Sequence, residues 1–556
     1  MARDAARRDQ RVSSQPATTP RAGARPAPLR LLDAVLSARG TRVDIAVVAA
    51  ITALAAGLRF WHLGTVPLGL HGDEAWTGID ARRILHEGWI GVYVRSALGQ
   101  PAGPLYVTAL LFSFLPETTA TARFSMALFG VATVPLAYLA FSSMFNRTVG
   151  AFSSLLLAVM MWHLHLSRTA FMVSAWPLTE VATIWLLWLA LRRRRMWLFG
   201  AAGAVHGLGV YTYNADLLFL PVPFVAIAWS VFAEHGRARR LRLLSGAAVF
   251  AATALIVAAP LVDYAVRHWH TYQYHERIVS VTASQEWKDA SILGKGGMVR
   301  RRADEWVRGI AVGGRPDLGD GLASDGHPLV DPLTLFLAAI GLGTVLWRWR
   351  RPESAVVVAV LVLLPWGALL TVEDGLFRRT LGLTPFIALL AALPLAWLWD
   401  GLWSIHDRWK PLFIVAVAGV VTLNGAWTVY QYFGPVQRTD TMRFVYPYQL
   451  DAASRFIAGL PPGTYIYFFS DRWRFDYETR RFLAPQATGE DRSKKFGATS
   501  PDDAYRIDTT GDVAFVFLGT YVDDVDKVRE QHPGGTETEA RRGDDVLFRA
   551  YVLTGR

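Results

Sequence analysis

Long apolar segments that carry few charges recur along the first 430 positions of the chain. A helix that crosses a membrane needs roughly 20 mainly apolar residues, and segments of about that length are regularly repeated here. They lie at 44–61, 122–141, 149–166, 172–191, 196–212, 215–233, 243–262, 331–347, 354–372, 380–399 and 411–430. The pattern predicts an α-helical polytopic membrane protein with about 11 transmembrane helices.

The polar stretches divide the chain into three expected regions. Residues 1–42 are rich in Arg, Ala, Pro, Ser and Thr, and this composition is typical of a disordered basic tail. Residues 43–432 form the expected transmembrane domain, with external loops at 62–121 and 263–330. Residues 433–556 alternate short apolar runs with polar segments, which predicts a small extracytoplasmic α/β domain.

The apolar segment at 103–115 decides on which side of the membrane each loop lies, because it is too short for an ordinary crossing. If it does not cross, the arginine clusters at 192–195, 237–242 and 348–351 fall on the same side as the N-terminus. The positive-inside rule favours this arrangement. We therefore expect a multi-pass protein of a bacterial plasma membrane, with its N-terminus in the cytoplasm and its C-terminal domain outside.

The net charge of +11 raises the question of nucleic acid binding, but the arginines stand at the ends of apolar runs. This placement indicates membrane orientation and membrane lipids as neighbours, and no nucleic acid partner is expected. The absence of cysteine excludes disulfides, thiolate metal sites and thiol nucleophiles. The sequence also has no Gly-x-x-x-x-Gly-Lys-Ser/Thr loop and no His-Glu-x-x-His motif, which argues against nucleotide handling and against a zinc protease.

Two adjacent acids, Asp73 and Glu74, follow the first apolar segment. A carboxylate beside lipid is costly unless it has a partner, so the pair needs an explanation. In one interpretation, a carboxylate accepts a proton from an acceptor hydroxyl at the membrane surface. In the other, Asp73 caps a short helix that runs from Glu74 to Glu87 and ends at Gly88.

Further polar residues gather at the expected outer ends of the spans, and together they predict a substrate-binding face. Each has a common alternative role, since arginines snorkel to head groups and tyrosines anchor at interfaces. His163 and His165 are two positions apart and do not share a helix face, so no metal site is predicted there. The candidate substrate-binding residues are Gln100, Arg123, His165, Arg168, Tyr211, Tyr213, Asn214, Arg378 and Arg379.

Several of these motifs together resemble the GT-C membrane glycosyltransferases of the protein-O-mannosyltransferase and aminoarabinose-transferase type, over about residues 44–400. The motifs are Gly72-Asp73-Glu74-Ala75, Gln100-Pro101, Pro104-Leu105-Tyr106, Ala122-Arg123-Phe124, His163-Leu164-His165-Leu166-Ser167-Arg168, Tyr211-Thr212-Tyr213, Asp331-Pro332-Leu333-Thr334 and Arg378-Arg379-Thr380-Leu381-Gly382. The resemblance implies a GT-C-like fold.

The resemblance also implies a reaction and its partners. An inverting hexosyl- or pentosyltransferase would move a sugar from a polyprenyl-phosphate-linked donor to a hydroxyl of an acceptor glycan, protein or lipid on the outer face. Carried over by motif, Asp73 would be the general base, and Glu74 would orient the acceptor or tune that base. Arg378, Arg379 and Arg168 would hold the leaving phosphate. The resemblance fixes no cofactor and leaves room for a divalent cation.

The sequence departs from the family pattern in two places. Many relatives carry a second acid where this chain has Met172, Val173 and Ser174, and a lysine where it has Gln100. These changes weaken the case for a two-acid metal site and indicate a different donor head group or acceptor. An alternative function is a transporter or flippase of an amphipathic lipid or glycolipid, which would place ionisable residues at mid-span; Glu180 is the main residue that fits. A non-catalytic membrane scaffold is a third interpretation.

Overall fold

The structure of the protein is a computed structural model that describes residues 42–314, 321–322, 326–372, 377–401, 407–496 and 504–555. The chain divides into two compact units, residues 1–47 and residues 48–556. Within the first unit only the start of α2 (Arg42–Phe60) is described. All the other elements below belong to the second unit.

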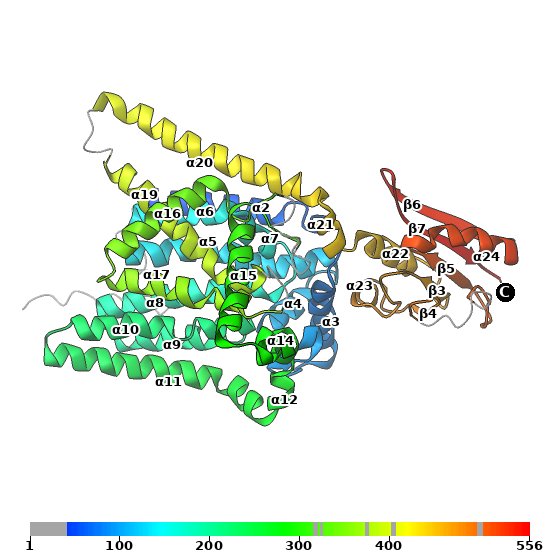
Figure 1. The fold of residues 1–556 in the computed structure, drawn as a ribbon, viewed down its shortest axis with the longest axis horizontal. Helices are drawn as coiled ribbons and strands as arrows, with labels where there is room; N and C mark the ends of the chain where they lie inside the picture. The colour runs from blue at the N-terminus through cyan, green and yellow to red at the C-terminus, as the bar shows by residue number, and fades with distance from the viewer. Residues whose placement is uncertain are drawn as a thin grey trace, which may run out of the picture. The chain divides into compact units, whose positions relative to one another are not determined.

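Eight helical segments of the described chain are long and apolar enough to cross a membrane. Together with adjoining short turns, their main helices are α2, α5 (Thr119–Met144), α8 (Trp176–Arg193), α10 (Val222–Ala233), α11 (Arg237–Arg267), α17 (Pro352–Leu363), α19 (Thr384–Gly401) and α20 (Lys410–Phe433) (Figure 1). Helices α6 (Arg147–Val159) and α7 (Met161–Ser167) form a further candidate, a span bent by 60°.

At two of the expected membrane-spanning segments, the helix is shorter than the apolar segment in the sequence. Helix α9 (Met196–Gly209) has 14 residues and α16 (Pro332–Trp347) has 16. Each of the expected spans therefore corresponds to a helix or a bent helix pair, and the expectation of a polytopic helical membrane protein is confirmed. The short apolar segment at 103–115, on which the expected membrane orientation depends, contains α4 (Gly103–Phe112), a helix of only 10 residues.

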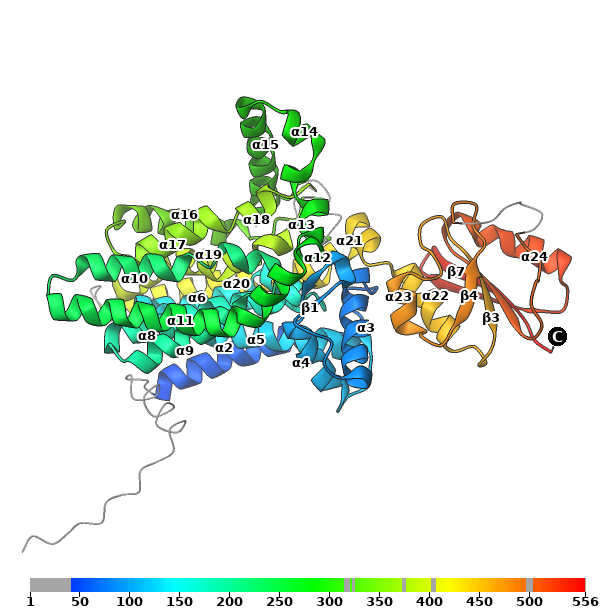
Figure 2. The same ribbon diagram turned by 90° about the horizontal axis from the view of Figure 1, so that it is seen from below.

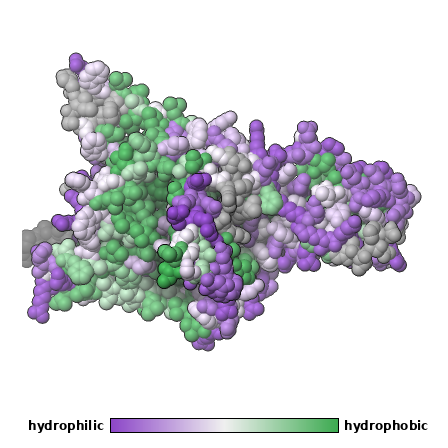
Figure 3. All heavy atoms as spheres, viewed as in Figure 1, coloured by the Kyte–Doolittle hydropathy of each residue, from purple (hydrophilic) through white to green (hydrophobic). Residues whose placement is uncertain are grey.

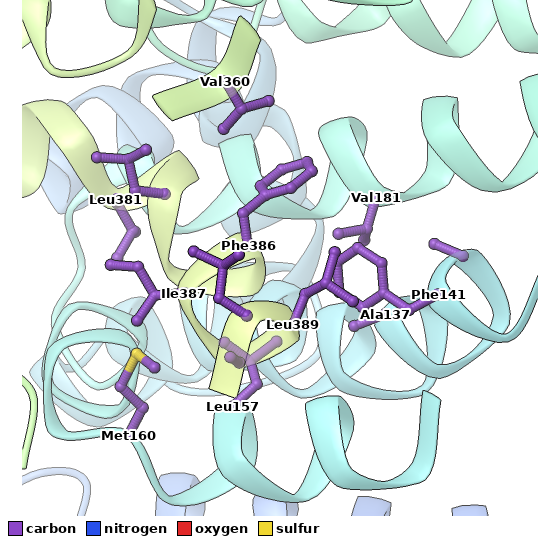
Figure 4. Packing of buried hydrophobic residues seen from close by; sticks show 14 of the residues in the cluster. Ala137, Phe141, Leu157, Met160, Val181, Val360, Leu381, Phe386, Ile387 and Leu389 are labelled. Atoms are coloured by element: carbon purple, nitrogen blue, oxygen red, sulfur yellow. The ribbon is translucent and has the colours of Figure 1, made fainter. Parts of the chain in front are cut away.

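Helix α19 lies at the centre of the helical core, and most of its side chains are buried. Phe386 and Leu389 of α19 lie among Phe141 of α5, Leu157 of α6 and Val181 of α8 (Figure 4). In a membrane the hydrophobic effect does not drive helices together, so close packing at small residues stabilises their contacts. Gly341 of α16 is such a contact, since an added Cβ would collide with the carbonyl oxygen of Leu390.

Large apolar side chains point outward from the long helices. Ile256 of α11 and Leu423 of α20 are 71% and 72% exposed. Figure 3 shows hydrophobic residues gathered over the helices and mainly hydrophilic residues over the C-terminal part of the chain. An apolar surface of this extent is what a lipid-facing surface requires.

The loops between the long helices contain short elements of their own. The first holds α3 (Gly72–Glu87) and a small antiparallel pair, β1 (Tyr93–Val94) and β2 (Gln100–Pro101). The segment after α11 forms three short helices followed by a longer one, as Figure 2 shows. These are α12 (Trp269–Tyr272), α13 (Tyr274–Val279), α14 (Gln285–Asp289) and α15 (Ile292–Ala311).

The C-terminal residues form a five-stranded sheet in the order β4-β3-β5-β7-β6. Strand β3 is parallel to β4 and β5, whereas β7 is antiparallel to β5 and β6. The elements are α22 (Tyr448–Ala458), β3 (Tyr465–Phe469), α23 (Glu478–Leu483), β4 (Thr488–Asp491), β5 (Val513–Phe517), α24 (Val525–Gln531), β6 (Thr536–Arg542) and β7 (Asp545–Leu553). The expectation of a small α/β domain is confirmed.

Close packing of α16 on α19 generates a stability prediction. Gly341→Leu should destabilise the protein by about 1–3 kcal/mol, because the new side chain must displace backbone of α19. Gly343→Leu in the same helix is the matched control, since nothing lies within 4 Å of its would-be Cβ. Thermal unfolding in detergent compares the two variants, and equal midpoints would contradict the packing argument.

Candidate active site

The start of α3 fixes the directions of the two acids. The N-cap is His71, whose Nδ1 accepts from the backbone N–H of Asp73 at 3.0 Å. The backbone N–H of His71 donates to Oε2 of Glu74 at 3.0 Å, which completes a capping box. The interpretation that Asp73 caps this helix is therefore wrong, although the helix does end at Gly88 as expected. The side chain of Asp73 is left for another role.

Glu74 is fully buried and both of its oxygens are engaged. Arg123 of α5 donates from Nε to Oε1 at 2.8 Å and from Nη2 to Oε2 at 3.0 Å. The backbone N–H of Ala170 also donates to Oε1 at 2.8 Å. Glu74 therefore ties α3 to α5 and to the loop after α7, and does not line the pocket described below.

Three other predicted substrate-binding residues also hold the loops together. Arg168 donates to the backbone carbonyls of Leu58 at 2.6 Å and Val66 at 3.1 Å. Nε2 of His165 lies 2.9 Å from the hydroxyl of Tyr446. The hydroxyl of Tyr211 donates to the carbonyl of Val257 at 2.7 Å. None of these side chains, nor that of Arg123, is among the residues that line the pocket around Asp73.

One pocket brings together the remaining predicted residues. Its lining includes Asp73, Gln100, Tyr213, Asn214, Arg378 and Arg379, which come from four separate parts of the sequence. Phe171, Met172 and Val173 supply an apolar wall. The pocket thus combines one carboxylate, two guanidinium groups and neutral hydrogen-bonding side chains.

Asp73 and Arg378 form an ion pair inside this pocket. Nη1 of Arg378 lies 2.9 Å from Oδ2 of Asp73, and the two side chains are 16% and 35% exposed. The guanidinium of Arg378 also lies 5.1 Å from the ring centre of Phe171. Burial raises the pKa of Asp73, but the positive charge of Arg378 and its hydrogen bond to the carboxylate outweigh burial and hold this pKa below its ordinary value. The carboxylate of Asp73 is therefore ionised at neutral pH.

Arg379 is a nearly buried cation with unused hydrogen-bonding capacity. Its Nη1 donates to Oγ1 of Thr371 at 2.9 Å, whereas its Nε has no hydrogen-bond partner in the described part of the chain. Arg379 is 9% exposed and lines the pocket, so its positive charge favours an anionic ligand there. Because guanidinium groups bind phosphate in a bidentate way, a phosphate is the ligand that best fits Arg378 and Arg379 together.

The pocket also contains residues that the sequence pattern did not single out. His275 of α13 joins the lining, and its Nδ1 lies 3.7 Å from Oε1 of Glu276. The proximity of His275 lowers the pKa of Glu276. The only signal in the sequence was that the segment 263–330 is a long external loop, because single histidines have no diagnostic spacing.

The C-terminal domain approaches the other side of Asp73 through α23. An added Cβ at Gly72 would lie 2.9 Å from the Tyr477 hydroxyl and 3.6 Å from Oε2 of Glu478. Burial raises the pKa of Glu478, and the negative charge of Asp73 adds to the increase. Phe482 packs against Gly78 of α3, so helix α23 contacts the helix that carries the acid pair.

The described residues contain no group of three or more His, Asp or Glu side chains that could hold a metal ion. Asp73 is the single carboxylate in the described lining of this pocket, and its neighbours from the second loop are the apolar Met172 and Val173. This donor set suits an anion held by arginines better than a cation held by two acids.

Comparisons with known proteins concern the sequence and the fold. Residues 99–264 match the sequence model of the dolichyl-phosphate-mannose-protein mannosyltransferase family. No curated protein matches the chain in sequence. The structure of the oligosaccharyltransferase of Archaeoglobus fulgidus tethered with an acceptor peptide has a TM-score of 0.54 at 14% identity and covers 81% of this chain. This chain spans only 64% of the length of that enzyme.

ArnT from Cupriavidus metallidurans matches along nearly its whole length. In its apo state the TM-score is 0.51 at 14% identity, with 92% of this chain and 97% of that chain covered. The same protein bound to undecaprenyl phosphate gives a TM-score of 0.50 at 14% identity, with the same coverage of the two chains. The fold is that of the GT-C membrane glycosyltransferases. Together with the family match over residues 99–264, this confirms the expected resemblance in fold to the protein-O-mannosyltransferase and ArnT type.

The different surroundings of the two acids generate a prediction. Glu74→Gln should destabilise the protein by about 3–5 kcal/mol, because it leaves the charge of Arg123 buried without a counter-charge. Asp73→Asn should cost about 1 kcal/mol or less, because its partly exposed ion pair is screened by water. Thermal unfolding of the two variants in one detergent measures the difference, and a larger loss for Asp73→Asn would contradict this division.

Proposed function

We propose that the protein is an inverting glycosyltransferase that moves a sugar from a polyprenyl-phosphate donor to a hydroxyl group of an acceptor. The observation that carries the proposal is the Asp73 pocket, in which an ionised carboxylate lies 2.9 Å from one guanidinium group and shares its lining with another. A base and a phosphate cradle thus lie side by side. The undecaprenyl phosphate bound to ArnT supports a donor of the same lipid class for this chain.

In the proposed reaction, Asp73 accepts the proton of the acceptor hydroxyl as the hydroxyl oxygen attacks the anomeric carbon. The bond from that carbon to the phosphate oxygen breaks on the opposite face of the sugar, so the configuration inverts. Arg378 and Arg379 stabilise the negative charge that grows on the leaving polyprenyl phosphate. A positioned base of this kind contributes about 10²- to 10⁴-fold to the rate.

The ion pair also couples donor binding to the strength of the base. While Arg378 is paired with Asp73, it lowers the pKa of the carboxylate and weakens it as a base. A donor phosphate competes for the same guanidinium with its own negative charge. Binding of the donor therefore raises the basicity of Asp73, which becomes an effective base when the leaving group is in place.

The proposed reaction takes place on the outer side of the membrane. The arginine clusters on the opposite loops support an outer-face position for the Asp73 pocket, because the positive-inside rule favours the cytoplasmic side for those clusters. Asp73 acts as the base, and Glu74 fixes the position of α3 through its bonds to Arg123 and Ala170. The acceptor is a glycan, protein or lipid with an available hydroxyl, and the transferred group is a hexosyl or pentosyl unit.

The role of Asp73 is tested by Asp73→Asn in proteoliposomes. The variant should lose at least about 10²-fold in sugar transfer from a panel of polyprenyl-phosphate hexoses and pentoses, because the amide cannot accept the proton. It should still bind undecaprenyl phosphate through Arg378 and Arg379. Asp476→Asn is the control, since this carboxylate is 70% exposed and is not among the pocket residues. Transfer by Asp73→Asn at the wild-type rate would refute the assignment.

The coupling between Arg378 and Asp73 predicts a change in the pH profile. Arg378→Gln should raise the pKa of Asp73, so the acidic fall of the transfer rate should begin at a higher pH than in the wild type. The sign follows because Asp73 acts as a base only above its pKa. Arg277→Gln in the same external region is the control. Transfer rates of both variants and the wild type are measured from acidic to neutral pH. An unchanged acidic limb would show that Arg378 does not act on the base.

A further inference from the structure

A second cavity lies at the opposite end of the helices from the Asp73 pocket. Helix α5 begins near Arg123, which binds Glu74, and ends at Met144, which lines the second cavity. Helix α19 likewise begins just after Arg379 and ends beside Asp400 in the lining. The cavity measures about 670 Å³, which is within the range of roughly 300–1,000 Å³ that ligand sites occupy.

Three arginines give this second cavity its charge. Arg192 lies in the last turn of α8, Arg348 is the C-cap of α16 and Arg351 is the N-cap of α17. In the described part of the chain none of the three guanidinium groups has an ion pair or a side-chain hydrogen bond. All three arginines are exposed residues of the cavity lining, and guanidinium groups without such partners favour an anion as the occupant.

The two acids of this cavity do not neutralise the arginines. Asp400 accepts hydrogen bonds from Nδ2 of Asn146 at 3.3 Å and Oγ1 of Thr148 at 3.0 Å. Glu353 lies in the first turn of α17, where the helix dipole stabilises a negative charge. Each carboxylate has its own stabilising partner but keeps its charge, so the lining carries three positive and two negative side chains, a net charge of +1.

The remaining lining is apolar and reaches the lipid-facing surface. Ile340 of α16 and Trp397 of α19 line the cavity and are 45% and 74% exposed. Tryptophan favours the boundary between the hydrocarbon and the head groups of a membrane. The ligand that matches both parts of the lining is amphipathic, with an anionic head for the arginines and an apolar tail for Ile340 and Trp397.

We propose that this cavity binds an anionic phospholipid, with its phosphate between Arg348 and Arg351 and an acyl chain along Ile340 and Trp397. In the orientation proposed above, this end of the protein faces the cytoplasmic leaflet, where anionic lipids are available. The lipid site is separate from the transfer reaction and rests on the proposed function only for this orientation.

Lipid binding is tested on the full chain in phosphatidylcholine nanodiscs titrated with phosphatidylglycerol. The variant Arg348→Gln/Arg351→Gln should bind phosphatidylglycerol at least about tenfold more weakly than the wild type, because two phosphate-binding charges are lost. The control Arg195→Gln/Arg350→Gln removes the same charge from exposed positions outside the cavity lining. Native mass spectrometry counts the bound lipids, and the control should match the wild type.

Three results would overturn the lipid site. Equal weakening in both double variants would show diffuse attraction to surface charge. Equal binding of phosphatidylcholine would show that the anionic head group is not recognised. Displacement of phosphatidylglycerol by millimolar inorganic phosphate would show a site for a soluble anion. If the cavity variant does not fold, a photoreactive phosphatidylglycerol on the wild type should label α16, α17 and α19 at this end, and labelling confined to other segments would refute the proposal.

Discussion

The buried ion pair between Glu74 and Arg123 is the constraint on which the site depends. Arg123 has five N–H donors, and each of its five hydrogen bonds goes to Glu74 or to a backbone carbonyl of Leu63, Pro67 or Gly69. Two buried charges are costly unless such bonds satisfy them. These bonds tie the start of α5 to the loop after α2 and to the first turn of α3.

Burial separates the roles of two acids that are neighbours in the sequence. Glu74 turns inward to Arg123, whereas Asp73 points to the pocket and meets Arg378. His71 takes over the capping role at the start of α3, so the carboxylate of Asp73 is not consumed by the helix end. In the proposed reaction, Glu74 therefore holds α3 in position while Asp73 acts as the base, and a preorganised site requires such support.

The sequence predicts the helices well because apolar periodicity and span length are local properties. It also predicts Asp73, Gln100, Arg378 and Arg379 as residues of one site, and the structure places all four in the same pocket. The pattern cannot distinguish Arg123 from Arg378, since both are arginines near span ends and only long-range contacts show which one is saturated by the loop. His275 escapes prediction for the same reason, because its partners lie far away in the sequence. The bend at Met160 and the short α9 and α16 depend on packing against neighbouring helices.

The hydrogen-bond count of an arginine therefore separates structural from ligand-binding positions. Arg123 has no donor left, and its charge is balanced inside the protein. Arg379 lines the Asp73 pocket with an Nε that has no partner in the described chain, and the exposed Arg348 and Arg351 have no side-chain partner there either. Snorkelling explains an exposed arginine at a helix end, but it does not explain a nearly buried one such as Arg379. The two proposed anions, a lipid-linked sugar phosphate at one end of the helices and a membrane phospholipid at the other, would give the arginines at both ends a counter-charge.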